Sequence, residues 1–241
     1  LVELLVGSLF VGLLLIELLS GGTNLPVRPI RQFASLPMIE HFTEWDLVAI
    51  YLFHATLVWF FTAVVLFRHD RNPVSKDFIN WALLIGIAAP TIWPWLRPDT
   101  LVAGMPSHWS AFWTGVLGQL LSLVLLGFVV RGAMSCVGRV DARGTIMGIV
   151  ADCMPPLLMA GAFLGPRALT SVVCWSLVVL IARRHYTLLF PRAAAGPIAL
   201  VLLIALLLHL TFWNTMTAVA WWPGPETSFW HMVGMLVILS T

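Results

Sequence analysis

Asp152 is the residue of this chain whose type and surroundings point most directly to chemistry. It lies in a long apolar run, about 8 residues from the basic end of that run, which is roughly 12 Å along a helix. Pro155 and Pro156 follow and lack the N–H groups that would bond carbonyls one turn earlier, so we expect the helix to break at the acid. An ionisable group beside irregular backbone within an apolar span indicates a site. The alternative is a structural acid that pairs with an arginine or satisfies the freed backbone.

A second carboxylate that suits this chemistry is Asp70, which lies in the sequence Arg68-His69-Asp70-Arg71 at the basic end of another apolar run. Two carboxylates that share one proton can activate water and protonate a leaving group. Asp70 and Asp152 together therefore predict aspartyl proteolysis. The alternative for Asp70 is an ordinary solvated turn that carries charges of both signs.

Four further ionisable residues lie within or beside apolar runs. Glu3 and Glu17 project within about 40° of each other on a helix, so one face of the first helix is expected to point inward. Glu3 either supports a site at its end of the bundle or extends to the headgroups. His54 and His209 are expected to form hydrogen bonds between helices rather than to bind a metal, and no metal or other cofactor is predicted.

The composition excludes a soluble globular fold, because only 10% of the 241 residues are charged and 60% are hydrophobic, whereas soluble domains carry about 25% charged residues. The apolar runs approach the ~20 residues of a spanning helix, and they do not alternate as barrel strands do. We predict an all-α, polytopic transmembrane bundle of about seven spanning helices in one membrane domain. The helices are expected over 1–20, 47–67, 79–95, 110–130, 144–165, 168–182 and 193–213, and the apolar tail 233–239 is too short to span.

The basic residues predict the orientation of this bundle in the membrane. Alternate connections carry nine Arg and Lys on one side (68, 71, 76, 131, 139, 143, 183, 184 and 192) and four on the other (28, 31, 97 and 167), so the first side should be cytoplasmic. The longest connection, 21–46, is too short for a core of its own. A net charge of +2 offers no basic surface for nucleic acid. Because the chain opens in a hydrophobic run without Met, we expect a fragment or processed chain.

Three segments resemble the type 4 prepilin peptidases, aspartic proteases of the bacterial inner membrane. Residues 1–10, LVELLVGSLF, are similar to the L-V-E-L-L-T-G-L-L-F segment of that family. Residues 67–70 and 77–80 resemble its I-D-x-D-x-x-x-x-P-D-x-I-T motif, and residues 150–152 with 157–165 resemble G-x-G-D-x-K-L-L-A-x-x-G-A-x-L-G. Ungapped from Phe67, the first catalytic Asp of the family falls on Arg68. Aligned backwards from Asp77 it falls on His69, and only a shift places it on Asp70. Counted back from Gly165, the second falls on Cys153, and Asp152 takes it with one extra residue.

The resemblance implies a multi-pass protein of the bacterial inner (plasma) membrane that cleaves the leaders of type IV pilin-like or pseudopilin precursors on the cytoplasmic face. Asp70 and Asp152 would be its catalytic acids, with Glu3, His69 and Asp77 in supporting positions. The expected partners are the lipid bilayer and pilin-like precursors. One alternative is a degenerate, non-catalytic member that acts as a scaffold in pilus or secretion assembly. A transporter or proton relay is the other, and it is disfavoured because only Asp152 is clearly within the membrane and no inverted repeat is visible.

Overall fold

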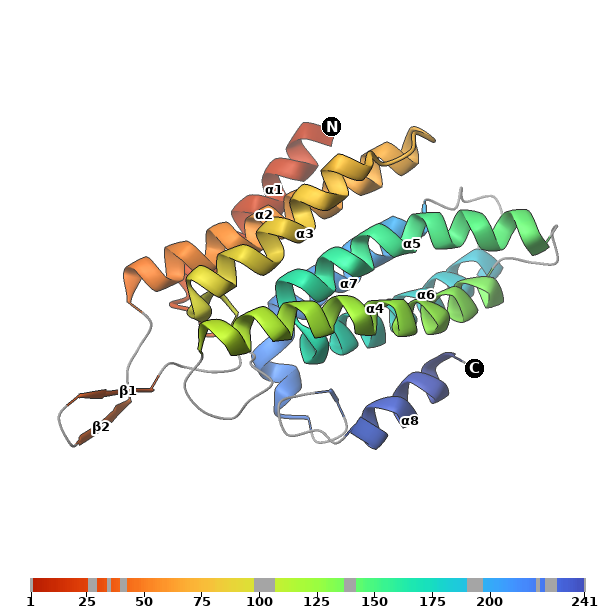
Figure 1. The fold of residues 1–241 in the computed structure, drawn as a ribbon. Helices are drawn as coiled ribbons and strands as arrows, with labels where there is room; N and C mark the ends of the chain where they lie inside the picture. The colour runs from red at the N-terminus through yellow and green to blue at the C-terminus, as the bar shows by residue number, and fades with distance from the viewer. Residues whose placement is uncertain are drawn as a thin grey trace.

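The computed structural model describes residues 2–25, 30–33, 36–39, 43–97, 107–136, 142–189, 197–219, 222–223 and 229–240, and it is a helical bundle with one small hairpin (Figure 1). Its elements are α1 (Val2–Leu14), the π-helix η1 (Leu15–Leu19), β1 (Ile30–Phe33), β2 (Leu36–Ile39), α2 (Glu44–His69), α3 (Lys76–Ile92), the short 3-10 helix η2 (Pro94–Leu96), α4 (His108–Cys136), α5 (Ala142–Leu164), α6 (Pro166–Leu189), α7 (Ile198–Thr217) and α8 (Phe229–Ser240).

Five helices are long and apolar enough to cross a membrane, namely α2, α4, α5, α6 and α7. The chain is therefore a multi-pass membrane protein of helical architecture. The remaining two predicted spans also form helices, but both are shorter than the five that can cross: α1 has 13 residues before it continues into η1, and α3 has 17. The predicted count of seven spanning helices is thus not confirmed. The C-terminal α8 has 12 residues and is too short to span, as the sequence predicts.

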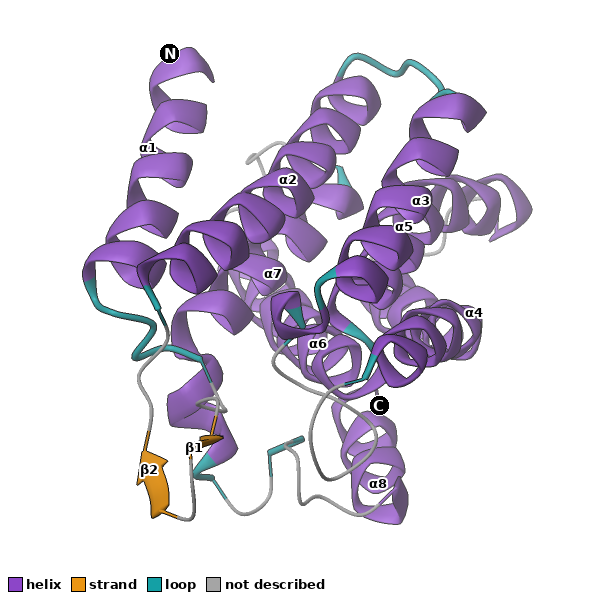
Figure 2. Ribbon diagram, turned by 60° about the vertical axis from the view of Figure 1, so that its left-hand side comes forward, coloured by secondary structure: helices purple, strands orange, loops and turns teal. Residues whose placement is uncertain are grey.

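The connection between η1 and α2, predicted as a loop without a core, contains an antiparallel hairpin in which Ile30 lies opposite Ile39. After it, Thr43 caps α2 in a capping box: its hydroxyl accepts from the Asp46 N–H, and the Asp46 side chain accepts from the Thr43 N–H. This cap satisfies two backbone donors where the long helix begins. The N-terminal part of α1, by contrast, stands apart from the other helices (Figure 2), and a Cβ added at Gly7 or Gly12 would meet nothing within 4 Å.

The centre of the bundle is the packing of α4 against α5, which glycine makes possible. A Cβ added at Gly118 would lie 2.1 Å from the carbonyl oxygen of Gly161, and one added at Gly161 would lie 2.3 Å from that of Gly118. The two backbones therefore touch, as small residues permit between membrane helices. Around this contact, α6 and α7 complete a core of Leu, Val, Ala and Phe side chains.

The predicted break at Asp152 is wrong. The helix α5 runs without interruption from Ala142 to Leu164, with Pro155 and Pro156 inside it. Proline fixes φ near the helical value, so the rings cost hydrogen bonds without forcing the chain out of the helix. Both rings are buried among neighbouring helices, which keep the segment helical where the backbone ladder is incomplete.

The path of α3 decides the topology of the bundle, and reporter fusions can test it. From the end of α2, α3 runs back to the end of the bundle where the hairpin lies, and α4 starts there (Figure 1). Its 17 residues span about 26 Å, short of a ~30 Å hydrocarbon core by an amount that local thinning accommodates. We expect fusions after Val74 and Ala142 to report one side, predicted cytoplasmic, and a fusion after Val102, which lies outside the described residues, to report the other. The same side from the fusions after Val74 and Val102 would show that α3 does not cross.

Candidate functional site

Asp152 forms an ion pair with Arg68, which joins the middle of α5 to the last turn of α2. The Arg68 Nε donates to Asp152 Oδ1 over 2.5 Å, across a sequence separation of 84 residues. Both side chains are mostly covered, with 21% of Arg68 and 17% of Asp152 exposed. The pair neutralises the carboxylate within the bundle, which is the structural alternative that the sequence left open for this acid.

The other predicted site residues do not join this pair. Asp70 caps the C-terminal end of α2 through its backbone N–H and is exposed, as is His69 before it. Asp77 lies in the first turn of α3 and is also exposed. Glu3 is exposed on the part of α1 that stands apart from the bundle (Figure 2). Among the residues that the structure describes, no contact brings Asp70 to Asp152, so a pair of carboxylates is not assembled.

This arrangement has consequences for acid–base chemistry. A guanidinium has no acceptor and does not release its proton in proteins, so Arg68 cannot act as the second acid or base of a proteolytic pair. One oxygen of the Asp152 carboxylate accepts a hydrogen bond from Arg68, and the positive charge of the guanidinium balances the negative charge of the carboxylate. The site therefore joins two helices through one ion pair, and within the described ranges no second carboxylate or histidine is hydrogen-bonded to Asp152.

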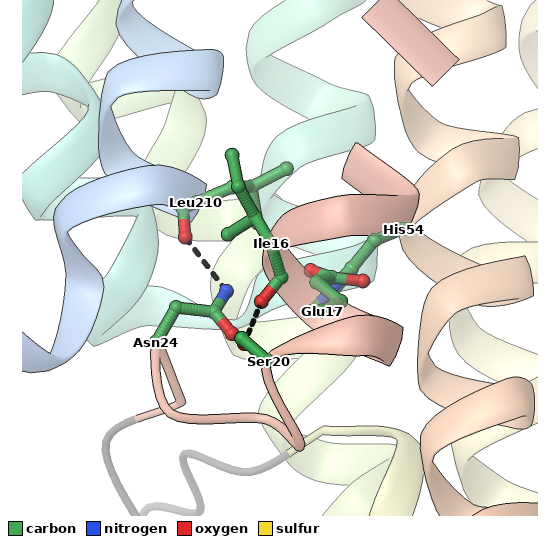
Figure 3. A network of polar contacts seen from close by, with 6 residues as sticks. All are labelled: Ile16, Glu17, Ser20, Asn24, His54 and Leu210. Carbon is green, nitrogen blue, oxygen red and sulfur yellow. Dashed lines mark hydrogen bonds and ion pairs between the residues drawn. The ribbon is translucent and has the colours of Figure 1, made fainter. Parts of the chain in front are cut away.

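A second polar site lies nearer the hairpin end, where Glu17 of η1 meets His54 of α2 (Figure 3). His54 Nδ1 and Glu17 Oε1 are 2.6 Å apart, and both side chains are essentially unexposed. The π-helix around Glu17 widens one turn and is the kind of local irregularity that recurs at functional positions. Asn24, just beyond η1, donates from its amide to the Leu210 carbonyl over 2.9 Å and ties this end of the first helix to α7.

His209 extends the buried polar region to α6 and the C-terminal segment. Its Nδ1 lies 3.0 Å from the Ser171 hydroxyl, which also accepts from the indole N–H of Trp222 at 2.8 Å. The expectation that His54 and His209 bond between helices is confirmed. Buried side-chain atoms that have no hydrogen-bond partner among the described residues include Glu17 Oε2, His54 Nε2 and His209 Nε2. Glu17, His54 and His209 thus add buried ionisable groups to the bundle, whereas the sequence places only Asp152 clearly within the membrane.

Arg97 is a buried residue whose role the sequence does not reveal, because its position in a connection between two apolar runs predicts a charge outside the bundle. Only 1% of it is exposed. Its Nε and one Nη donate over 2.9 Å to the carbonyls of Phe163 and Gly86, and it also donates to those of Ala111 and Ala162. One guanidinium thereby satisfies carbonyls of α3, α4 and α5.

Comparisons with known proteins identify no relative. No protein-family model matches the chain. No curated protein and no solved structure matches it significantly. Within the described part of the chain, no three His, Cys, Asp or Glu residues gather in a way that could hold a metal ion.

Proposed function

We propose that this protein is a non-catalytic membrane scaffold of prepilin-peptidase-like design, which holds pilin-like precursors by their hydrophobic segment during assembly of a pilus or secretion apparatus. The observation that carries the proposal is the ion pair between Arg68 and Asp152. In the ungapped comparison from Phe67, the first catalytic acid of that family falls on Arg68, and Asp152 lies one residue from the place of the second. An arginine facing the remaining acid keeps the two segments together while removing the proton chemistry.

The rival proposal is an active aspartic endopeptidase that uses Asp70 and Asp152. It requires Asp70 to leave the exposed end of α2 and displace Arg68 from the carboxylate. Displacement would leave a guanidinium and a carboxylate partly buried without their partners, which is costly. The geometry therefore favours the scaffold over the enzyme.

Co-expression with a type IV prepilin in bacterial membranes tests the proposal. We expect the precursor to co-purify with its leader uncleaved, above the level recovered with an unrelated multi-pass protein. Asp70→Asn is expected to change neither result, because no hydrogen bond or ion pair joins the Asp70 carboxylate to Arg68 or Asp152 in the part of the chain that the structure describes. Asp152→Asn should lower the stability of the protein by about 1–3 kcal/mol through loss of a charge-assisted hydrogen bond, and Arg68→Gln in the same chain should recover part of that loss.

The outcome that contradicts the scaffold is specific. Cleavage by the unmodified protein that Asp70→Asn and Asp152→Asn each abolish would establish the enzyme, because asparagine keeps the size of the acid but cannot carry its proton. A precursor that is neither cleaved nor co-purified would remove both proposals.

A further inference from the structure

An open groove of about 600 Å³ runs between α3 and α4. Its α3 wall consists of residues 80, 83, 84, 87, 88, 91 and 92, and its α4 wall includes Phe112 and Gln119. Most of this surface is apolar, and its outer members are well exposed: Leu84 by 55% and Ile92 by 77%. The groove lies away from Arg68 and Asp152, neither of which lines it.

The spacing of the α3 wall fits a helix rather than a loosely bound chain. The seven α3 positions are separated by three residues and one residue in turn, so they all lie on one face of the helix. This face is about 18 Å long at 1.5 Å per residue. Phe112 and Gln119 are two turns apart and mark a facing stripe on α4. Side chains repeating in this way form the seam into which another helix packs its own side chains.

Two amides interrupt the apolar lining at one level. His108 Nδ1 lies 2.6 Å from the Thr91 carbonyl oxygen and sets the register of α3 against α4. Asn80 lies 11 residues before Thr91, and Gln119 lies 11 residues after His108, so each lies about 16 Å from that contact. Because both residues line the groove, their amides lie at about the same depth in it.

These amides lack internal partners. Asn80 is exposed and Gln119 is half-buried, and neither amide forms a hydrogen bond with the part of the chain that the structure describes. Gln119 lies well inside an apolar span, where an unpaired amide facing hydrocarbon is costly. Polar side chains at this depth normally bond to a polar group on a neighbouring helix.

We propose that the groove between α3 and α4 seats a single transmembrane helix of another protein, whose amide or hydroxyl side chain bonds to Gln119 and Asn80. The helical stripe supplies the shape of the occupant, and the amides supply its chemistry. A lipid chain fits the apolar wall but offers no hydrogen-bonding group at the level of the amides. This inference rests on the groove alone and does not depend on the scaffold proposal.

The test uses the purified protein in phosphatidylcholine vesicles with synthetic probe helices. Two Lys-flanked Leu/Ala peptides of about 20 residues differ only in a central Gln or Leu. Photoreactive p-benzoylphenylalanine replaces Ile92 at the rim of the groove, and in a control it replaces Leu123, which is 50% exposed on α4 and does not line the groove. We expect the Gln peptide to crosslink at position 92 with an affinity about three- to tenfold above that of the Leu peptide.

A second variant keeps the result interpretable. Gln119→Leu suits a lipid-facing helix and should fold, and it should bring the Gln peptide down to the affinity of the Leu peptide. Equal crosslinking at positions 92 and 123, or an unchanged preference in Gln119→Leu, would overturn the proposal. Crosslinks at position 92 between copies of this chain that exclude the peptide would also overturn it, because the groove would then be a self-association face.

Discussion

Replacement of Arg97 by leucine is expected to lower the free energy of unfolding by at least about 3 kcal/mol. The guanidinium donates to carbonyls on three helices, and leucine removes these donors, at a cost of about 1–3 kcal/mol for each buried carbonyl that is left without another donor or water. The chain contains 12 tryptophans, so intrinsic fluorescence during denaturant titration in micelles can follow the loss.

Two comparisons separate geometry from charge at this position. Arg97→Lys keeps the charge but not the planar fork, so it should restore only part of the stability. Arg131→Leu removes an arginine that is exposed on α4 and should change stability by about 0.5 kcal/mol or less. If Arg97→Leu behaved like Arg131→Leu, the four carbonyl contacts would have no energetic role.

Replacement of Gly118 by valine is expected to separate α4 from α5 and to destabilise the protein by more than about 3 kcal/mol. Even the first carbon of the new side chain would lie 2.1 Å from the Gly161 carbonyl oxygen, and backbone on both helices leaves no flexible group to give way. Overpacking of this kind typically costs about 1–3 kcal/mol where only side chains must shift, so a backbone clash should exceed that range. Thermal unfolding in micelles measures the effect.

The matched control lies on the same helix. A Cβ at Gly127 would meet nothing within 4 Å, so Gly127→Val should leave stability unchanged or raise it by up to about 0.5 kcal/mol, because valine has a higher helix propensity than glycine. Gly161→Ala should resemble Gly118→Val, because it clashes with the same contact from the other side. Equal tolerance at Gly118 and Gly127 would contradict the close approach of α4 and α5.

The helices were predictable from local pattern. Each of the seven predicted segments contains a helix, the first continuing as a π-helix and the last beginning at Ile198, with 193–196 outside the described residues. The helices are predictable because backbone polar groups in lipid must be satisfied within the segment, so only length and polarity need be known. The same reasoning anticipated that His54 and His209 would bond between helices. The same reasoning wrongly predicted a helix break at Pro155 and Pro156, where packing keeps α5 helical although two backbone N–H donors are missing.

The partners of the polar residues were not predictable, because they depend on which helix faces meet. Arg68 and Asp152 are 84 residues apart, and nothing local distinguishes a free acid from a paired one. The sequence places Arg97 in a connection, and only the tertiary structure shows that carbonyls of three helices surround its side chain. Periodicity is a property of one segment, whereas ion pairs, glycine contacts and grooves are properties of two or more. The sequence therefore identified the helices and the candidate acids, while the packing of α2 against α5 turned the predicted carboxylate pair into an arginine–carboxylate pair.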